Sequence, residues 1–142
     1  ENVAGIRALH KAAVLAENER NERFHQYQEF KETMKKIWEQ EGITYKVNGS
    51  SKFTMPHILN VSFPGVKTEV LLVNLDLAGI AASSGSACTA GTLEPSHVLT
   101  AMFGKDERTK SSVRYSFGFG NKLEDIEYAA AETAKIVKRL TK

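Results

Sequence analysis

The first forty residues predict a long helix, because they lack proline and contain a single glycine, Gly5. The second half of this stretch carries large apolar residues at spacings of three and four, which places them on one helical face. These residues are Phe24, Tyr27, Phe30, Met34, Ile37 and Trp38. We expect this face to pack in a core rather than to form a cofactor site. Gly42 is expected to follow the end of the helix, since glycine readily adopts the positive φ found there.

A polar segment divides this predicted helix. Every residue at 17–23 is polar, so this part of a helix would have no face to bury and we expect it to cross solvent. The apolar residues Val3, Ile6, Leu9 and Ala13 would then pack on a different partner or a neighbouring domain. A loop that splits the segment into two helices is the alternative.

After Gly42 the chain alternates between strand-like and helix-like patterns. Residues typical of strands occur at 43–47, 57–63, 80–82 and 113–117. Helices are expected in three places: from an N-cap at Thr68 to a stop at Gly79, from Pro95 in a first turn, and along the apolar stripe of 123–140. This mixture predicts an α/β fold, a two-layer sandwich of a small, mainly antiparallel sheet with helices on one face, preceded by a long connecting helix.

Composition and charge exclude several classes of protein. The 142 residues are enough for one domain, and a net charge of +2 is too small to argue for direct nucleic-acid or membrane binding. No apolar run approaches the ~20 residues that span a bilayer. The single cysteine excludes a disulfide framework within the chain, so a reducing, cytoplasmic location is expected. The chain begins at Glu1 rather than at methionine, and we expect it to be a piece of a longer protein.

The histidines and the glycosylation motifs carry little weight. No pair of histidines has the spacing of metal ligands and none lies beside the cysteine, so we expect no metal site; the four are His10, His25, His57 and His97. The sequons at Asn48 and Asn60 are expected to be chance matches, because no secretion signal accompanies them.

Cys88 is the main candidate for chemistry. A structural cysteine is normally surrounded by large apolar residues, whereas Cys88 lies among serine, glycine, alanine and threonine within 83–91. Two interpretations stay open, a reactive thiol on a flexible arm and a connecting loop that happens to contain a thiol. If the thiol is reactive, a fixed pair with His97 suits a flexible arm poorly, and a redox sensor would need a second cysteine. Carriage of sulfur or an acyl group fits best, and a peroxidatic thiol resolved by another protein also fits.

Arg114 is the second candidate. It lies within the expected strand 113–117, between apolar and aromatic neighbours. Its guanidinium could hold a substrate carboxylate through two parallel hydrogen bonds. The strand pattern by itself favours the alternative, an internal salt bridge or an exposed strand face.

Four separated segments resemble one enzyme family. Residues 83–88, followed by 93–99, closely resemble the catalytic loop of cysteine desulfurases of the NifS/IscS type, which are class-V aminotransferase-related enzymes that use pyridoxal phosphate. Residues 1–6, 56–63 and 111–118 resemble three further segments of that family in the same order. The resemblance therefore covers nearly the whole chain.

The resemblance implies a mechanism. The thiolate of Cys88 would attack the sulfur of L-cysteine, L-alanine would leave, and the resulting persulfide would pass to a sulfur-acceptor protein, either an Fe–S scaffold or a tRNA-thiolating enzyme. Arg114 matches the family's arginine that holds the substrate α-carboxylate, which replaces the salt bridge favoured above. The loop 83–92 resembles the group with the longer, mobile loop, and the full-length family members are homodimers.

One difference from the family concerns the cofactor. The family's Schiff-base lysine lies in a Ser-x-His-Lys segment that this chain lacks, so we expect no cofactor-binding residue here. The resemblance is to a connecting helix at 1–20, which follows an absent large cofactor domain, and a C-terminal small domain at 21–142. We expect the chain alone to bind no pyridoxal phosphate and to release no alanine. Two alternatives are a stand-alone module that accepts persulfide or docks on a scaffold, and a selenocysteine lyase-like enzyme.

Overall fold

The computed structural model describes residues 1–85 and 95–142. Along the chain the elements are α1 (Val3–Gln40), β1 (Lys46–Val47), β2 (Ile58–Ser62), α2 (Thr68–Leu77), α3 (His97–Phe103), the 3₁₀ helix η2 (Glu107–Lys110), β3 (Ser112–Ser116) and α4 (Leu123–Leu140). None of the helices in this described part is both long and apolar enough to cross a membrane.

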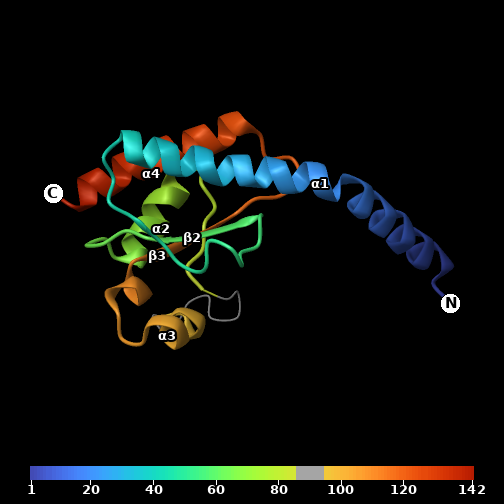
Figure 1. Ribbon diagram of the computed structural model, residues 1–142, viewed down its shortest axis with the longest axis horizontal. Coiled ribbons are helices and arrows are strands. Elements are labelled where there is room, and N and C mark those ends of the chain that lie inside the picture. The colour runs from blue at the N-terminus through green and yellow to red at the C-terminus, as the bar shows by residue number, and fades with distance from the viewer. Residues whose placement is uncertain (86–94) are drawn as a thin grey trace.

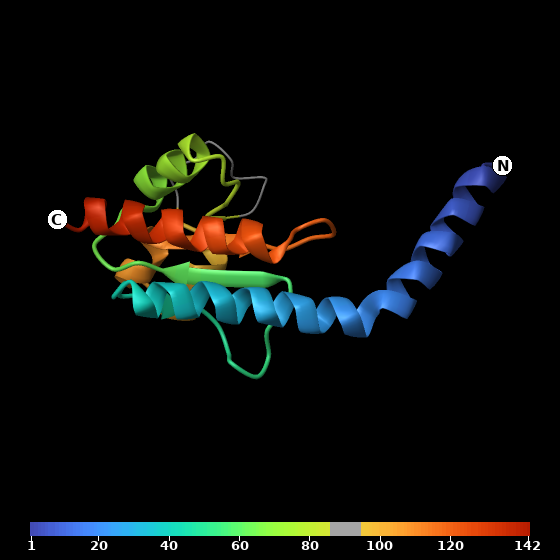
Figure 2. The ribbon, with the colours of Figure 1, turned by 90° about the horizontal axis from the view of Figure 1, so that it is seen from above.

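The strands form one antiparallel sheet in the order β1-β2-β3. Helices α1 and α4 lie side by side over one face of this sheet, and α2 flanks α4 (Figures 1 and 2). The short α3 and η2 lie beyond the opposite face (Figure 1). The predicted fold class, a small antiparallel sheet with its main helices on one face and a long helix in front, is confirmed.

The core lies between the sheet and the pair α1 and α4. Trp38 of α1 is completely buried, and its indole Nε1 donates to the carbonyl oxygen of Ala130 in α4 at 3.1 Å. Val61 and Val113 come from β2 and β3 and are also fully buried. The aromatic face predicted for α1 is therefore a packing face, except that Phe24 remains 40% exposed.

Helix α1 is unbroken across the polar segment 17–23, so the two-helix alternative is wrong. Its N-terminal half extends away from the sheet (Figure 2), and Ile6 and Leu9 on it are exposed. Within the polar segment, Arg23 Nε donates to Glu19 Oε2 at 2.9 Å one turn earlier, so the helix supports itself there through its own side chains. Gly42 has φ +67° just after the helix, as predicted.

One predicted strand is shorter in the structure, and another is absent. The expected strand 43–47 is reduced to Lys46–Val47, because Ile43 instead donates its N–H to the carbonyl oxygen of Trp38 at the end of α1. The expected strand at 80–82 is absent, and only an isolated bridge at Ser83 pairs with β3. A buried apolar residue such as Ile80 is consistent with either a strand or a connecting segment, so burial alone could not decide.

Two predicted helix starts are also corrected. Lys67, not Thr68, occupies the N-cap position of α2, and the Thr68 hydroxyl donates instead to the carbonyl oxygen of Ser112 at 3.2 Å. Pro95 lies before α3 rather than in its first turn, because Ser96 is the N-cap and its Oγ accepts from Leu99 N–H. In both cases a polar side chain found a tertiary or cap partner that local sequence did not indicate.

Candidate functional site

The sheet face turned away from α1 and α4 carries a line of polar residues. Arg114 on β3 lies opposite Asn60 on β2, and Ser83 pairs with Arg114 on its other side. Asn48, directly after β1, donates its N–H to the carbonyl oxygen of Asn60 at 2.9 Å. We call these four residues (Asn48, Asn60, Arg114 and Ser83) the polar row. Because side chains alternate along a strand, the apolar neighbours of the row point into the core.

Arg114 is held by its backbone on one side and faces Asn60 on the other. Its N–H and C=O both bond Ser83, the Ser83 N–H donating to the carbonyl oxygen of Arg114 at 3.1 Å. The side chain is half-buried, and its Nε is buried with no hydrogen-bond partner in the part of the chain that the structure describes. Among the described residues Arg114 forms no salt bridge. A buried donor that none of the described residues satisfies is consistent with an acceptor supplied by a ligand.

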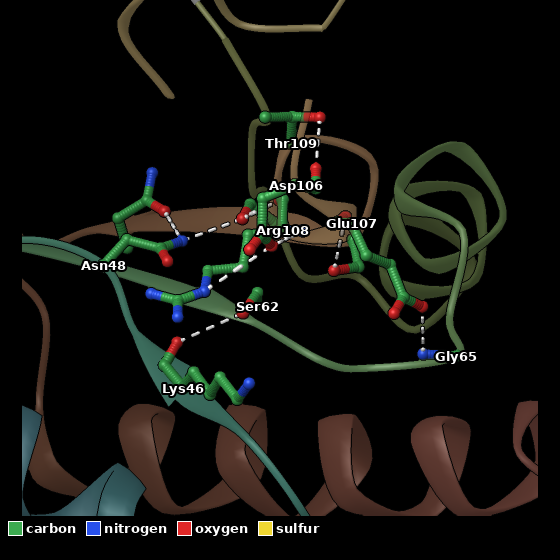
Figure 3. A network of polar contacts seen from close by, with 11 residues as sticks. Lys46, Asn48, Ser62, Gly65, Asp106, Glu107, Arg108 and Thr109 are labelled. Atoms are coloured by element: carbon green, nitrogen blue, oxygen red, sulfur yellow. Dashed lines mark hydrogen bonds and ion pairs between the residues drawn. The ribbon is translucent and has the colours of Figure 1, made fainter. Parts of the chain in front are cut away.

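The amides of the row are joined to each other. Asn48 Nδ2 donates to Asn60 Oδ1 and to Ser112 Oγ, each at 2.8 Å (Figure 3). In the sequence, Asn48 and Asn60 stood out only as sequons, and their pairing was not predicted. The one available signal was the position of Asn60 between Leu59 and Val61, which places a polar side chain on the face opposite the core.

Helix η2 is hydrogen-bonded to the sheet on the face that carries the polar row. Ser112 Oγ donates to the carbonyl oxygen of Arg108, and Glu107 Oε1 accepts from Gly65 N–H at 3.0 Å (Figure 3). The Arg108 guanidinium lies 4.6 Å above the ring of Phe103, the last residue of α3. These contacts connect α3 and η2 to the strands that carry the polar row.

The predicted thiol is not placed by the structure. Cys88, and the part of the predicted loop 83–92 from residue 86 onward, lie outside the described residues. His97 is the first residue of α3 and is exposed. Within residues 1–85 and 95–142, no three histidine, cysteine, aspartate or glutamate side chains gather into a group that could hold a metal ion.

Comparison with known families decides the assignment. A family model described as aminotransferase class-V matches residues 1–129. The chain belongs to this family. It is 52% identical over 142 residues to a Bacillus subtilis protein named "Putative cysteine desulfurase IscS 1", covering 99% of this chain and 38% of the relative. It is 50% identical over 94 residues to the "Cysteine desulfurase IscS" of Pseudomonas entomophila, covering 66% of this chain and 23% of that protein.

Two solved structures share the fold of this chain. A "NIFS-LIKE PROTEIN" aligns with a TM-score of 0.79 at 22% identity, covering 98% of this chain and 34% of the other. A NifS-like protein from Rickettsia africae aligns with a TM-score of 0.78 at 25% identity, covering 97% and 35%. The chain therefore spans less than two fifths of the length of these relatives.

The class-V aminotransferase family implies pyridoxal phosphate, which needs an amine for its aldehyde and donors for its phosphate. A cavity of about 460 Å³ lies between Ile80, the end of β3 and the start of α4. The only charged residue in its lining is Asp125, whose carboxylate would repel a phosphate. This cavity does not fit the cofactor.

A second cavity, of about 620 Å³, lies between α1 and the residues that follow β1. It contains Lys31, a buried lysine whose Nζ donates to the carbonyl oxygen of Met55. Burial, assisted by the nearby charge of Lys35, lowers the pKa of Lys31. Lys35 is itself paired with Glu32. Since both ammonium groups already have protein partners, this second cavity does not fit pyridoxal phosphate either.

Proposed function

We propose that this chain is the C-terminal part of a cysteine desulfurase, in which Cys88 receives sulfur from L-cysteine. The names of the curated relatives support this assignment, and the match covers almost all of the chain. The cofactor chemistry is assigned to parts of the complete protein beyond this chain. By itself the chain would then neither bind pyridoxal phosphate nor release L-alanine.

The proposed sulfur transfer balances without an external oxidant. The Cys88 thiolate attacks the sulfur of L-cysteine, an S–S bond forms, and the carbon–sulfur bond of the substrate breaks. The bonding pair stays on the carbon, which takes a proton and leaves as L-alanine. The persulfide on Cys88 would then pass to an acceptor protein for Fe–S cluster assembly or tRNA thiolation. Ser83, which pairs with Arg114, precedes Cys88 by five positions and begins the segment that carries the thiol.

The observation that carries the proposal is the state of Arg114. Its backbone is fixed by Ser83 and its strand lies opposite Asn60, while its buried Nε has no acceptor among the described residues. A guanidinium held in this way can grip the α-carboxylate of L-cysteine through two parallel hydrogen bonds. It would hold the substrate near the segment from which the thiol approaches.

For the organisation of the complete protein, we propose that 1–20 is a connecting helix and 21–142 a small domain of a homodimeric cytoplasmic enzyme. The exposed apolar residues Ile6 and Leu9 support a partner surface for the first part of α1. The packed core that starts at Tyr27 supports a separate small domain.

The thiol is tested by intact mass. The complete enzyme is incubated with L-cysteine, and the Cys88 peptide is expected to gain about 32 Da as a persulfide. Cys88→Ser is the control, which should lose both the adduct and sulfide release while keeping the visible absorbance of the cofactor. Sulfide release retained by Cys88→Ser would refute the role of this thiol.

Arg114 is tested by kinetics. Arg114→Ala is expected to raise KM for L-cysteine mainly, because the lost interaction binds the substrate. Arg114→Lys should rescue poorly, since a point charge cannot reproduce two parallel hydrogen bonds. An unchanged KM in Arg114→Ala would contradict the assignment.

A further inference from the structure

We propose that Asn60 is a second carboxylate-binding residue beside Arg114, and that Asn48 is the positioning residue that orients it. This inference rests on the proposed function, because it needs Arg114 to bind the substrate carboxylate. It adds two residues that lie far from Arg114 in the sequence.

The pairing pattern brings Asn60 close to Arg114. Phe63 N–H donates to the carbonyl oxygen of Ser111, and Phe117 N–H donates to that of His57, which identifies the hydrogen-bonded positions between β2 and β3. Asn60 and Arg114 fall between these positions, as a non-hydrogen-bonded pair. Such pairs bring opposite side chains closer together than the hydrogen-bonded pairs do. The amide of Asn60 and the stem of Arg114 therefore leave the sheet side by side.

The Asn48 contact determines which way the Asn60 amide points. Asn60 Oδ1 accepts from Asn48 Nδ2 at 2.8 Å, on the β1 side of the strand. Because the amide is planar, its two N–H donors then point in other directions, and no described residue accepts from them. Asn48 is itself held by a second bond, to Ser112 Oγ at 2.8 Å. The arrangement leaves Asn60 Nδ2 as a donor on the sheet face from which the Arg114 side chain also projects.

A substrate carboxylate can accept hydrogen bonds from both the Arg114 guanidinium and the Asn60 amide. Its two oxygens offer about four acceptor positions, and a bidentate arginine occupies only two of them. An amide N–H next to the guanidinium can fill a third. The polar row would then bind amino acids more tightly than amines that lack the carboxylate. An acidic residue in place of Asn60 would repel the substrate carboxylate and compete with it for Arg114.

The test compares two inhibitors of the complete enzyme, L-alanine and ethylamine, of which only the first has a carboxylate. Asn60→Ala is expected to weaken inhibition by L-alanine about tenfold, as the loss of a hydrogen bond to a charged group predicts. Inhibition by ethylamine should stay within about twofold, since it makes no such bond. Asn48→Ala should weaken L-alanine inhibition less, about threefold, because the Asn60 amide is present but not oriented.

Asn60→Asp is the decisive variant because it preserves the shape of the side chain. Its carboxylate should pair with Arg114 and weaken L-alanine inhibition further than Asn60→Ala does. Asn74→Asp on α2, whose side chain contacts Arg139 instead, is the matched control and should behave as wild type. Wild-type inhibition in both Asn60 variants, or equal losses for the two inhibitors, would overturn the inference and leave the proposed function intact. An absence of any desulfurase turnover in the wild-type complete enzyme would overturn both.

Discussion

The two faces of the small sheet differ in burial and in the polarity of their side chains. On the face toward α1 and α4, Val61 and Val113 are fully buried in apolar surroundings. One position along the same strands, Asn60 and Arg114 point to the other side and belong to the polar row. The strand period of two separates a face that packs against the helices from the face for which we propose ligand binding. The packed face keeps the backbone rigid, so the polar side chains need not contribute to stability themselves.

The largest loss of stability is expected from a substitution on the core face of α1. Trp38→Ala should lower the free energy of unfolding by about 3–5 kcal/mol, because it empties a fully buried site and removes the indole hydrogen bond to the carbonyl oxygen of Ala130. Chemical denaturation followed by circular dichroism measures this, since Trp38 is the only tryptophan in the chain. Phe119→Ala, at an exposed ring, is the control and should change stability little. A loss at Trp38 as small as that at Phe119 would remove the distinction between core and surface.

Neighbouring positions on β3 provide the direct comparison of faces. Val113→Ala should cost about 2 kcal/mol of unfolding free energy, from two lost methyl groups and the cavity they leave. Arg114→Ala should cost less than about 1 kcal/mol, because its guanidinium has no ion-pair partner among the described residues. Chemical denaturation curves of the two variants measure the difference in unfolding free energy. A larger loss of stability for Arg114→Ala would mean that the outer face also holds the fold.

Tyr115 should produce a pH-dependent effect. Burial raises the pKa of its phenol well above the usual value, and the hydroxyl must donate to Thr133 Oγ1 at 3.0 Å because Thr133 itself donates to Ala129. The folded state therefore retains the proton more strongly than the unfolded state. The contribution of Tyr115 to the free energy of unfolding is fully present below about pH 10, the pKa of tyrosine in the unfolded chain. Above that pH it falls, by up to about 1.4 kcal/mol per pH unit.

Tyr115→Phe should lower stability at pH 8 by about 1 kcal/mol and make this alkaline decline shallower. Tyr45 contributes in the same direction, because burial, followed by its bond to Glu39, raises its pKa to about 12. Unfolding midpoints between pH 8 and 11 for Tyr115→Phe and Tyr45→Phe separate the two contributions. An unchanged pH dependence in Tyr115→Phe would show that this phenol ionises as easily in the folded state as in the unfolded one.

The smallest effect is expected in the first half of α1. Leu9 is 72% exposed, so Leu9→Ala should change the unfolding free energy of this chain by no more than about 0.5 kcal/mol. In the complete protein the same variant should be clearly destabilising, because the proposed partner surface would cover Leu9 there. Thermal unfolding of both proteins makes the comparison, and an equally small effect in both would contradict the proposed partner surface.

Periodicity in the sequence identified the elements whose stability comes from an amphipathic face. The helices α1 and α4 and the strands β2 and β3 lie where the apolar spacing predicted them. The prediction from periodicity was less accurate for the short segments, since β1 is reduced to two residues and 80–82 form no strand. Short segments gain or lose a strand partner according to the rest of the fold, so their own residues do not decide their structure.

The candidate site divides in the same way. Local sequence singled out Arg114 because an arginine inside an apolar strand needs a partner. It could not supply Asn48, Asn60 or Ser83, which lie 31 to 66 positions away along the chain. Only the strand register and the bridge to β3 bring these three residues beside Arg114.

The sequence by itself determined the fold class, the buried face of α1 and a chain rich enough in apolar residues for one core, because these follow from patterns within a few turns or one strand. The tertiary structure alone decided the polar row, the hydrogen bond between Asn48 and Asn60, and the burial of Arg114 Nε with no acceptor among residues 1–85 and 95–142. The physical reason is that a side chain's neighbours across a sheet are set by register, and register depends on the packing of the whole core.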